Sequence, residues 1–468
     1  MDLAAGLLTA DAGLVLLAAY FTVVSFREKE PRAPWVGAIA TVLLAGVGLL
    51  IVAVPAVRTA IGVIFGAVLA FGSVLLIPTR GNPRALQGAA GYVVGEAGRF
   101  DERDEVFARN RSLPPGSEVY RCYYAEHPER EARDSARRSK GGSVGRMGSI
   151  DNGHRPNVAM IQACFEMPGV FGKLAEALPT AGSVPEPLDP ARATTIVKGL
   201  ARRIGAGLVG VCRVNPAWAY SHRGEIFYGN WDDWGREIPE PLPFAVVIAT
   251  EMDHGNVGTG PHTPALFESA FNYGQGALIT TILSRWFAAM GYRAVAQHSR
   301  HYDLNMVPLA IDAGLGELGR FGYLISGEFG PRVRLFAVTT DMPLAVDRPI
   351  DLGADGFCRG CLKCAESCPS KSIPVGGRTV VNGVEKWKLD AESCFDFWGR
   401  VGTDCSVCMG VCPFSRPNRG IHRLARWMIR RSSLARRVLP HVDNFVYGKR
   451  WKPRPAREWI AFPASGDL

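Results

Sequence analysis

Cys358–Pro369, which reads CRGCLKCAESCP, is the stretch that decides how this chain is built. Its four cysteines have the spacing Cys-x2-Cys-x2-Cys-x3-Cys-Pro, and Cys394 and the run Cys405–Pro413, spaced Cys-x2-Cys-x3-Cys-Pro, follow it. Such a run is typical of bacterial ferredoxins, in which its fourth cysteine binds the other of two [4Fe–4S] clusters. Closely spaced thiolates wrap one cubane, and the longer step before the proline sends the fourth thiolate outward. The sequence therefore predicts two [4Fe–4S] clusters.

The spacing also predicts which cysteines share a cluster. One set is Cys358, Cys361, Cys364 and Cys412, and the other is Cys368, Cys394, Cys405 and Cys408. Zinc also binds four cysteines, but in paired Cys-x2-Cys knuckles, and disulfides are rare in the cytoplasm. We expect neither here, because the cluster pattern occurs twice. Three more of the eleven cysteines, Cys122, Cys164 and Cys212, lie outside any motif and are expected to be ordinary buried thiols.

Residues 191–345, which precede the cysteines, alternate between helical and strand patterns. Helices are predicted over Thr194–Ile204 and Phe267–Met290, and strands over Gly207–Val211, Phe244–Ala249 and Val333–Thr339. This alternation indicates an α/β or α+β sheet domain. Clusters carry single electrons but do not select a reaction, so we expect the terminal electron acceptor in this domain.

Residues 1–82 form the most apolar part of the chain. Arg58 is the only charged residue between positions 33 and 79, and Asp11 is the only one between positions 3 and 26. Because about 20 apolar residues cross a bilayer, we predict a membrane anchor of three transmembrane helices, Leu3–Phe26, Trp35–Val54 and Ala60–Ile77. Carboxylates are rare in lipid, so we expect Asp11 to lie near the head groups or to face another helix.

A cleaved signal peptide is the alternative for the first apolar segment. It would need basic residues at its start, yet no Lys or Arg precedes Arg27, and no twin-arginine signal is present. The basic segments Arg27–Arg32 and Arg80–Arg84 fall on one side of a three-helix arrangement. The positive-inside rule makes that side cytoplasmic. We therefore expect a multi-pass protein of the inner membrane with its catalytic domain in the cytoplasm.

The remaining segments carry weaker signals. Residues 83–190 are polar and form an N-terminal soluble segment, in which Ser139–Ser143 and Gly148–Gly153 look like loops. Residues 346–420 are expected to form the ferredoxin-like domain, and residues 421–468 a basic C-terminal extension. Arginines set among apolar residues in this extension fit either a helix on an anionic membrane surface or a tail packed on the main domain.

Residues 190–415 resemble the reductive dehalogenase family in sequence and in motif order. The matching segments are Gly205–Val211, Trp218–Ser221, Ile248–Asp253, Ala313–Arg320, Phe329–Arg334 and Thr340–Leu344, followed by both cysteine motifs. The resemblance implies a nitroreductase-like α/β core that holds a corrinoid, with a ferredoxin-like insert that delivers electrons to cobalt. It also implies reductive cleavage of a carbon–halogen bond in an organohalide.

Reductive removal of halide needs one proton, and the resemblance implies which residues supply it. Tyr273 resembles the proton-donor tyrosine of the family, and Arg334 falls on the arginine that assists it. A guanidinium favours tyrosinate by Coulomb attraction and so makes the phenol a better donor. The alternatives are a core tyrosine whose hydroxyl binds backbone and a surface ion-pair arginine. His301 takes the pocket position where some relatives carry Asn or Lys, and it titrates near neutral pH.

The resemblance further implies how the corrinoid is held. No Asp-x-His-x-x-Gly motif is present, since Asp253-His254-Gly255 does not fit it. A base-off corrinoid without a protein ligand on cobalt is therefore expected. Its binding would depend on backbone amides and on glycines that permit close approach, Gly314, Gly316 and Gly319.

Two rival functions remain open at the level of sequence. Epoxyqueuosine reductase shares the corrinoid core and cluster motifs but acts on tRNA, and the net charge of +9 fits RNA only weakly. A membrane-bound electron-transfer subunit would need no corrinoid. We expect membrane lipid, an organohalide and a quinol-linked or ferredoxin- or flavodoxin-like electron donor as partners, and no nucleic acid.

Overall fold

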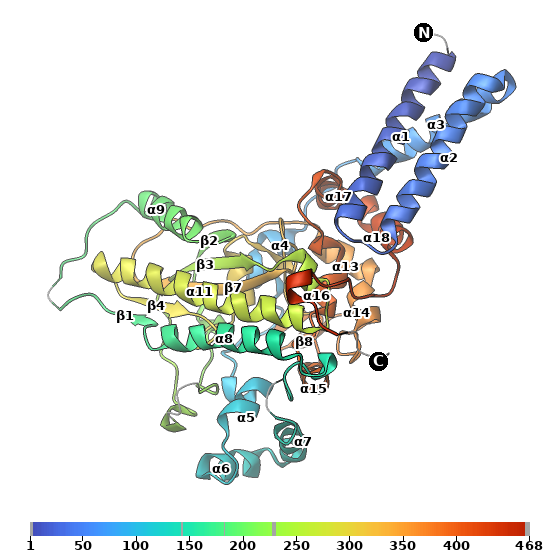
Figure 1. The fold of residues 1–468 in the computed structure, drawn as a ribbon. Coiled ribbons are helices and arrows are strands. Elements are labelled where there is room, and N and C mark those ends of the chain that lie inside the picture. The colour runs from blue at the N-terminus through green and yellow to red at the C-terminus, as the bar shows by residue number, and fades with distance from the viewer. Residues whose placement is uncertain (1–2, 142–143, 182, 227–230, 464–468) are drawn as a thin grey trace. The chain divides into compact units, whose positions relative to one another are not determined.

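Two groups of elements make up the structure, a computed structural model that describes residues 3–141, 144–181, 183–226 and 231–463 (Figure 1). Contacts divide the chain into a helical unit, Met1–Gly81, Gly356–Cys361 and Asn418–Pro455, and a sheet unit, Asn82–Asp355, Leu362–Pro417 and Ala456–Leu468. The helical unit holds α1–α3, and the sheet unit holds the segment that the sequence marks for catalysis. The finer division into five domains stays a prediction.

A five-stranded sheet in the order β1-β4-β7-β3-β2 forms the centre of the sheet unit. Its strands are β1 Glu176–Ala177, β2 Leu208–Arg213, β3 Phe244–Glu251, β4 Ala294–Gln297 and β7 Val333–Thr340. Each neighbouring pair is antiparallel. The three strands predicted from the sequence are confirmed, and the mixed α and β content is that of the expected fold class.

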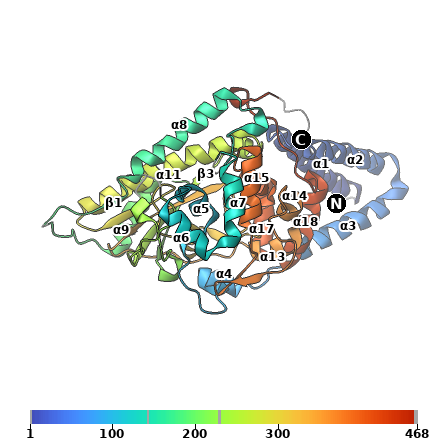
Figure 2. The same ribbon diagram turned by 90° about the horizontal axis from the view of Figure 1, so that it is seen from below.

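Helices cover both faces of this sheet, which explains why β3 is apolar at nearly every position. Val246 and Ile248 pack towards α9 (Pro190–Arg203) and α11 (Thr263–Ala289). Val247, between them, packs towards α12 (Met306–Asp312) on the other face. Figures 1 and 2 show α8 (Arg155–Gly172) running beside α11. The predicted long helix before Gly291 is confirmed.

A glycine brings α11 close to the sheet. A Cβ atom built on Gly276 would lie 2.2 Å from the ring of Phe336 in β7, so only glycine permits this approach. Tyr273 of α11 and Arg334 of β7 each lie close in sequence to this contact. The close packing of α11 on β7 therefore lets side chains of these two elements meet.

The segment before β1 contains more helix than its polar sequence suggested. Its elements are α4 Pro83–Leu86, η2 Gly88–Tyr92, η3 Glu102–Asp104, α5 Val106–Ser112, α6 Glu118–Glu126, α7 Pro128–Arg138, η4 Ser149–Asp151 and α8. The expected loop at 148–153 contains η4, and that at 139–143 lies partly outside the described residues. Charged side chains of α5 and α7 bind partners elsewhere in the sheet unit, as shown below, which stabilises helices that lack an apolar stripe.

The cysteine-rich segment folds as two matching halves. Helix α14 (Lys363–Ser367) precedes Cys368, and α16 (Val407–Val411) precedes Cys412. Leu362 and Ser406, which cap the two helices, share a left-handed backbone with φ of 52° and 55°, a conformation that non-glycine residues seldom adopt. Helix α13 (Ala354–Cys361), strands β8 (Thr379–Val381) and β9 (Val384–Lys386), and helix α15 (Ala391–Val401) complete this segment. This internal repeat is the one that the cysteine spacing predicts.

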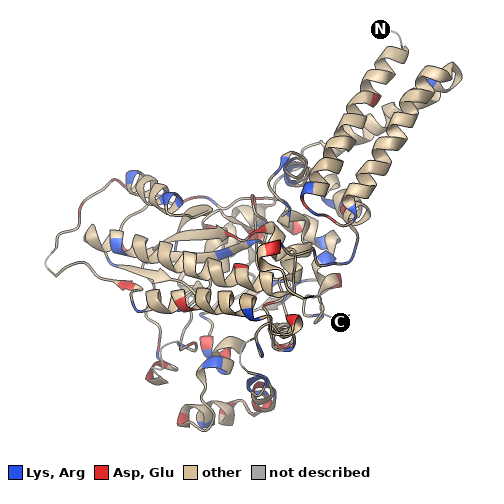
Figure 3. Cartoon of the chain, in the orientation of Figure 1, with Lys and Arg blue, Asp and Glu red and all other residues tan. Residues whose placement is uncertain are grey.

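The helical unit contains three helices that are long and apolar enough to cross a membrane. They are α1 Leu3–Arg27, α2 Ala33–Ala53 and α3 Arg58–Leu75, close to the predicted bounds, and Figure 3 shows almost no charge along them. Asp11 faces α2, because its carboxylate oxygen lies 2.6 Å from a Cβ built on Gly48. One of the two expectations for this carboxylate, that it faces another helix, is confirmed.

The basic tail belongs to the helical unit as α17 (Gly420–Arg431) and α18 (Ser433–Tyr447). His422 Nε2 lies 3.0 Å from Glu28 Oε2, and Arg454 donates to Glu30 Oε1 at 2.6 Å. Both glutamates follow α1 directly and are buried. The tail therefore packs on the ends of the apolar helices, an arrangement that neither expectation for it had named.

Candidate active site and iron–sulfur centre

The four cysteines of the second predicted set lie together in the sheet unit. Burial raises the pKa of Cys394 and Cys408 to about 12 and that of Cys405 well above its usual range. Neighbouring thiols add to this effect, since Cys368 acts on Cys394 and Cys408, and Cys394 acts on Cys405 and Cys408. Iron ions would stabilise the thiolates that burial disfavours. The donor set therefore fits a buried cluster.

The cysteines of the first predicted set come from both halves of the repeat. Cys358 and Cys361 lie on α13, Cys364 lies on α14, and Cys412 follows α16. Their grouping on one cluster stays a prediction.

The other three cysteines follow their expectation only in part. Cys212 is buried and Cys164 half-buried, whereas Cys122 is exposed, so the expectation of burial is wrong for Cys122. All eleven cysteines lie within the described residues, and no disulfide joins any of them.

Tyr273 and Arg334 lie side by side across the contact between α11 and β7. The guanidinium carbon of Arg334 lies 5.1 Å from the centre of the Tyr273 ring. Arg334 donates to Asp404 Oδ2 at 2.7 Å and to the hydroxyl of Ser269, one helical turn before Tyr273. Asp404 directly precedes Cys405. The arginine thus connects the tyrosine with the backbone that carries a predicted cluster ligand.

The surroundings of this pair argue against the two structural alternatives. The Arg334 side chain is 12% exposed, so it is not a surface ion-pair residue. The Tyr273 ring packs near Phe165 and Phe336, but its hydroxyl makes no hydrogen bond with any residue that the structure describes. Tyr273 instead lines a cavity of about 260 Å³, here called the Tyr273 cavity, together with Phe165, Leu304, Met306, Leu335 and Phe336. The hydroxyl is therefore available to a bound molecule.

His301 does not line this cavity. It lines a neighbouring one of about 270 Å³, here called the surface cavity, and its Nε2 lies 3.9 Å from Glu176 Oε1. His298 lines the Tyr273 cavity instead, because residues 298 and 301 pair through backbone hydrogen bonds of 2.8 Å in a tight turn. Burial, with help from His301 and Arg300, lowers the pKa of His298 to about 3, so this imidazole is neutral at physiological pH. Position in the sequence could not show which of the two histidines the turn would place in the Tyr273 cavity.

The three predicted glycines are packed against the protein itself. A Cβ on Gly314 would lie 2.4 Å from the carbonyl oxygen of Arg348, and one on Gly316 would lie 2.2 Å from that of Ile325. A Cβ on Gly319 would lie 3.0 Å from side-chain atoms of Ile325 and Phe321. Close backbone packing therefore requires glycine at Gly314 and Gly316, whereas Gly319 is close only to side chains. The predicted contact of all three with a cofactor stays a prediction.

A third cavity of about 270 Å³, here called the Trp218 cavity, lies on the other side of the segment 304–307. Asn305 and Val307 line it together with Trp218 and Tyr92, whereas Leu304 and Met306 line the Tyr273 cavity. The Tyr92 hydroxyl is buried and has no hydrogen-bond partner among the described residues.

The Tyr273 and Trp218 cavities suit a corrinoid, whose flat ring needs apolar walls and whose amide side chains need polar partners. The walls next to the segment 304–307 are apolar, and the Tyr92 hydroxyl is a buried polar group still able to bond. The residues present therefore fit such a group.

Comparison with known proteins first defines the class. Residues 357–415 match the family model described as a 4Fe-4S dicluster domain. This match confirms that the cysteine-rich segment is an iron–sulfur domain of the ferredoxin-like kind. It covers the whole internal repeat and both cysteine motifs.

Longer similarities then point to one family. The chain is 35% identical over 277 residues to the tetrachloroethene reductive dehalogenase of Sulfurospirillum multivorans, covering 52% of this chain and 54% of that protein. It is 31% identical over 277 residues to the enzyme of the same name from Desulfitobacterium hafniense, covering 50% of each chain. A solved structure, the catabolic reductive dehalogenase NpRdhA, matches with a TM-score of 0.62 and 25% identity over 83% of this chain and 52% of that one.

These similarities support the reductive dehalogenase family for this chain, as its motifs predicted. The chain spans about half the length of the curated relatives that it matches.

Proposed function

We propose that this protein is a reductive dehalogenase, an oxidoreductase that replaces a halogen of an organohalide with hydrogen. The observation that carries the proposal is the Tyr273–Arg334 pair. Tyr273 lines a cavity, and Arg334 beside it bonds Asp404, the residue before a predicted cluster ligand. A proton source and an electron source then lie on either side of one arginine. Similarity to tetrachloroethene reductive dehalogenases over half of the chain supports the same activity.

Tyr273 gives its proton to the substrate carbon in this proposal. Its hydroxyl is free to do so, and its ring is held by Phe165 and Phe336. Arg334 stabilises the tyrosinate that remains, because its largely buried guanidinium lies 5.1 Å from the centre of the Tyr273 ring. Asp404 and Ser269 hold the guanidinium in place by hydrogen bonds.

The walls of the Tyr273 and Trp218 cavities would hold a base-off corrinoid. When bound, this group would supply a cobalt centre able to accept electrons and break a carbon–halogen bond. Leu304 and Met306 would form an apolar wall, and the Tyr92 hydroxyl would bind a polar edge group. An antiparallel sheet covered by helices on both faces supports a nitroreductase-like core for this domain.

Two [4Fe–4S] clusters would supply the electrons. The matched halves with Leu362 and Ser406 support one cluster for each half, with the fourth cysteine of each half crossing to the other cluster. The proposed sets are Cys358, Cys361, Cys364 and Cys412, and Cys368, Cys394, Cys405 and Cys408.

The apolar helices α1–α3 would anchor the protein in the inner membrane, with the sheet unit in the cytoplasm. Their length and composition support three spans, and the positions of the basic residues support this orientation. The partners in this arrangement are membrane lipid and an electron donor that is quinol-linked or resembles ferredoxin or flavodoxin. Protease digestion of right-side-out vesicles should leave the sheet unit intact, and digestion of inverted vesicles should remove it.

Anaerobic purification with added corrinoid, followed by metal analysis and halide-release assays, tests the function. We expect iron, sulfide and cobalt in the purified protein, and release of halide from aliphatic or aromatic organohalides. Iron and sulfide without cobalt, whatever corrinoid is offered, would favour the electron-transfer subunit. A cobalt-loaded protein that releases no halide but reduces an epoxyqueuosine-containing tRNA stem-loop would favour the rival tRNA enzyme.

A further inference from the structure

Two carboxylates and two guanidinium groups also line the Tyr273 cavity. Each carboxylate is bonded to a tyrosine, Glu105 to Tyr220 and Glu225 to Tyr302. If Tyr273 donates a proton in each turnover, as proposed above, it must regain one before the next. The contacts of these two pairs offer a route by which a proton can return to Tyr273.

Direct hydrogen bonds fix the geometry of both pairs. The Tyr220 hydroxyl donates to Glu105 Oε1 at 2.9 Å, and the Tyr302 hydroxyl donates to Glu225 Oε2. Arg111 donates to the other oxygen of Glu225 at 2.5 Å. The two tyrosine rings lie edge to face with centres 6.0 Å apart. Glu105 therefore has one neutral hydrogen-bond partner, whereas Glu225 has a cationic one.

The charges around Glu105 favour a retained proton. Burial and the nearby Glu225 together raise its pKa to about 7, although the hydrogen bond from Tyr220 partly opposes this change. Arg109 and Lys386 also lower it, but Arg109 is bonded to Asp134 and Glu392. Glu102 does not line the cavity, and it accepts a bond from the amide of Gly224 at 2.8 Å. Burial, Glu225 and Glu105 raise its pKa to about 8. Glu105 is therefore a carboxyl that exchanges its proton close to neutral pH.

A second cavity connects Glu225 to the protein surface. Glu225 and Arg300 line both the Tyr273 cavity and the surface cavity. The surface cavity is also lined by Arg236, whose side chain is 58% exposed, and by Asp233 and His301. Water that enters the surface cavity can therefore reach the carboxylate of Glu225, which faces the Tyr273 cavity on its other side.

We propose that Glu105, held by Tyr220, returns a proton to the Tyr273 oxygen in each turnover, and that Glu225 with Tyr302 admits protons from the surface cavity. This inference rests on the proposed function. The overall reaction takes an organohalide, two electrons from the clusters and one proton to the hydrogenated product and a halide ion. The Tyr273 O–H bond breaks as the product C–H bond forms. The Glu105 O–H bond then breaks as the Tyr273 O–H bond forms again, and water in the surface cavity restores the proton of Glu105.

The Glu105→Gln variant tests this role, with Glu102→Gln as the matched control. Glu102 is a buried carboxyl of similar titration, but it does not line the Tyr273 cavity. We expect the wild-type rate of halide release to fall as pH rises above about 7, because the protonated form of Glu105 is the active one. Glu105→Gln should lower the steady-state rate about 10² -fold or more, yet release one halide per enzyme at the wild-type rate, because Tyr273 begins protonated. Glu102→Gln should keep the wild-type rate and pH profile.

The Tyr220→Phe variant adds a test in which the carboxyl remains. Loss of the hydrogen bond should raise the pKa of Glu105, since this bond lowers it. The fall in rate should then move to higher pH. An infrared titration of the same holoenzymes does not depend on turnover. The difference between wild type and Glu105→Gln should show one protonated carboxyl that is lost near pH 7, and the difference between Tyr220→Phe and a Tyr220→Phe/Glu105→Gln double variant should show the same carboxyl lost at higher pH; carboxyls such as Glu102 cancel in both differences.

A Glu105→Gln enzyme with the wild-type steady-state rate and pH profile, or one without the single fast turnover, would overturn the proposal while the proposed function stands. Absence of halide release from the cobalt-loaded wild type would instead remove the proposed function and this inference with it.

Discussion

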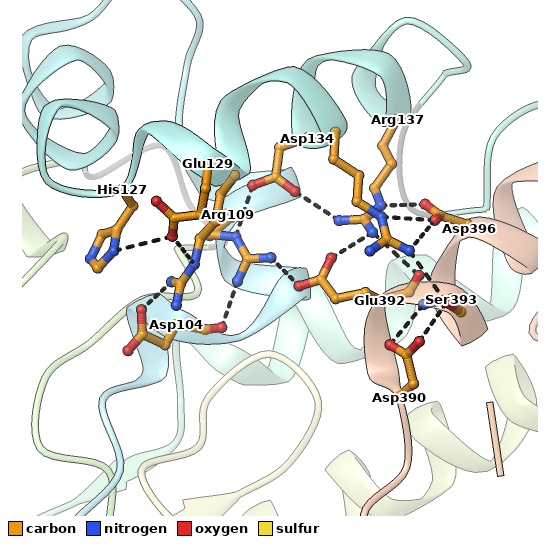
Figure 4. Close-up of polar contacts among 12 residues, drawn as sticks. Asp104, Arg109, His127, Glu129, Asp134, Arg137, Asp390, Glu392, Ser393 and Asp396 are labelled. Carbon is orange, nitrogen blue, oxygen red and sulfur yellow. Dashed lines mark hydrogen bonds and ion pairs between the residues drawn. The ribbon is translucent and has the colours of Figure 1, made fainter. Parts of the chain in front are cut away.

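Two groups of buried charges share the segment 101–138, and they are built in opposite ways. Between α5, α7 and α15, each buried charge meets an opposite one (Figure 4). Arg109 binds Asp134 at 2.8 Å, and Arg137 binds Asp134 at 2.7 Å and Asp396 at 2.6 Å. On the wall of the Tyr273 cavity, by contrast, Glu105 lies near Glu225 and Glu102 and receives its bond from a neutral tyrosine.

The two groups have different roles: the matched charges stabilise the fold, and the carboxyls of the cavity serve the proposed reaction. Matched buried charges stay ionised and hold elements together, because removal of one partner leaves the other unpaired and desolvated. Carboxyls without a matching cation keep their protons up to neutral pH. The first arrangement fixes α15, which carries Cys394, and the second keeps protons available beside Tyr273.

Removal of the Tyr273 hydroxyl should have the largest effect. Tyr273→Phe is expected to lower the rate of halide release by about 10² to 10⁴-fold, the usual contribution of a positioned proton donor. Iron and cobalt contents should not change. Tyr292→Phe is the control, because its hydroxyl bonds only the backbone oxygen of Glu186, at 3.2 Å, among the described residues. Wild-type turnover by a metal-replete Tyr273→Phe enzyme would remove the assignment.

Breaking the matched group should destabilise the fold. Asp134→Ala leaves Arg109 and Arg137 without their shared carboxylate, and all three side chains are at most 5% exposed. We expect a loss of about 3–5 kcal/mol in the free energy of unfolding, measured with urea on the holoprotein. The matched Glu129→Ala change, at a side chain 65% exposed, should cost less than about 1 kcal/mol. Equal effects of the two variants would show that burial of the network is not what stabilises it.

The carboxyls without a matching cation should instead make stability depend on pH. The folded-state pKa of Glu102 is raised to about 8 from 4.5, so its protonated form is favoured in the folded protein. Its contribution to stability is complete below about pH 4.5 and is lost as pH rises through 8. In the wild type, the free energy of unfolding should therefore fall by a few kcal/mol over this pH range, and in Glu102→Gln this fall should be absent. Unfolding measured at several pH values tests this. A parallel pH profile for variant and wild type would contradict the raised pKa.

The smallest expected effect is a difference in the rate of iron loss between variants of two arginines that bind the same carboxylate. Arg133 and Arg137 both bind Asp396, but the first side chain is 45% exposed and the second 5%. Arg137→Gln should speed the loss of iron to a chelator several-fold, because α15 and Cys394 lose a buried support. Arg133→Gln should leave that rate within about twofold of the wild type. Iron loss that is equally fast in both variants would refute the supporting role of the network.

The sequence was most informative where a pattern is local. The cysteine spacing predicts the iron–sulfur domain because its ligands are few residues apart, and the repeat of Leu362 and Ser406 follows that spacing. The apolar helices and the central strands were likewise predicted within a few residues. Tyr273 and Arg334 came from the family resemblance, since neither residue has a local signal.

The features that could not be predicted from the sequence depend on contacts between residues that are far apart in the chain. Arg109 and Glu392 are 283 positions apart, so the helices they stabilise looked like polar loop. Glu105 was missed for the same reason, because its titration depends on burial and on Glu225 in a distant segment. His298 rather than His301 lines the Tyr273 cavity because of one tight turn.

The short segment 304–307 separates the Tyr273 cavity from the Trp218 cavity, because its alternate side chains line one cavity or the other. Exchange of Leu304 or Met306 would therefore act on the Tyr273 cavity, where the proposed corrinoid and organohalide would meet, while Asn305 and Val307 line the Trp218 cavity. Met306, which is only partly buried, is the better position at which to vary this wall, because Leu304 belongs to the same core cluster as Trp218 of the other cavity.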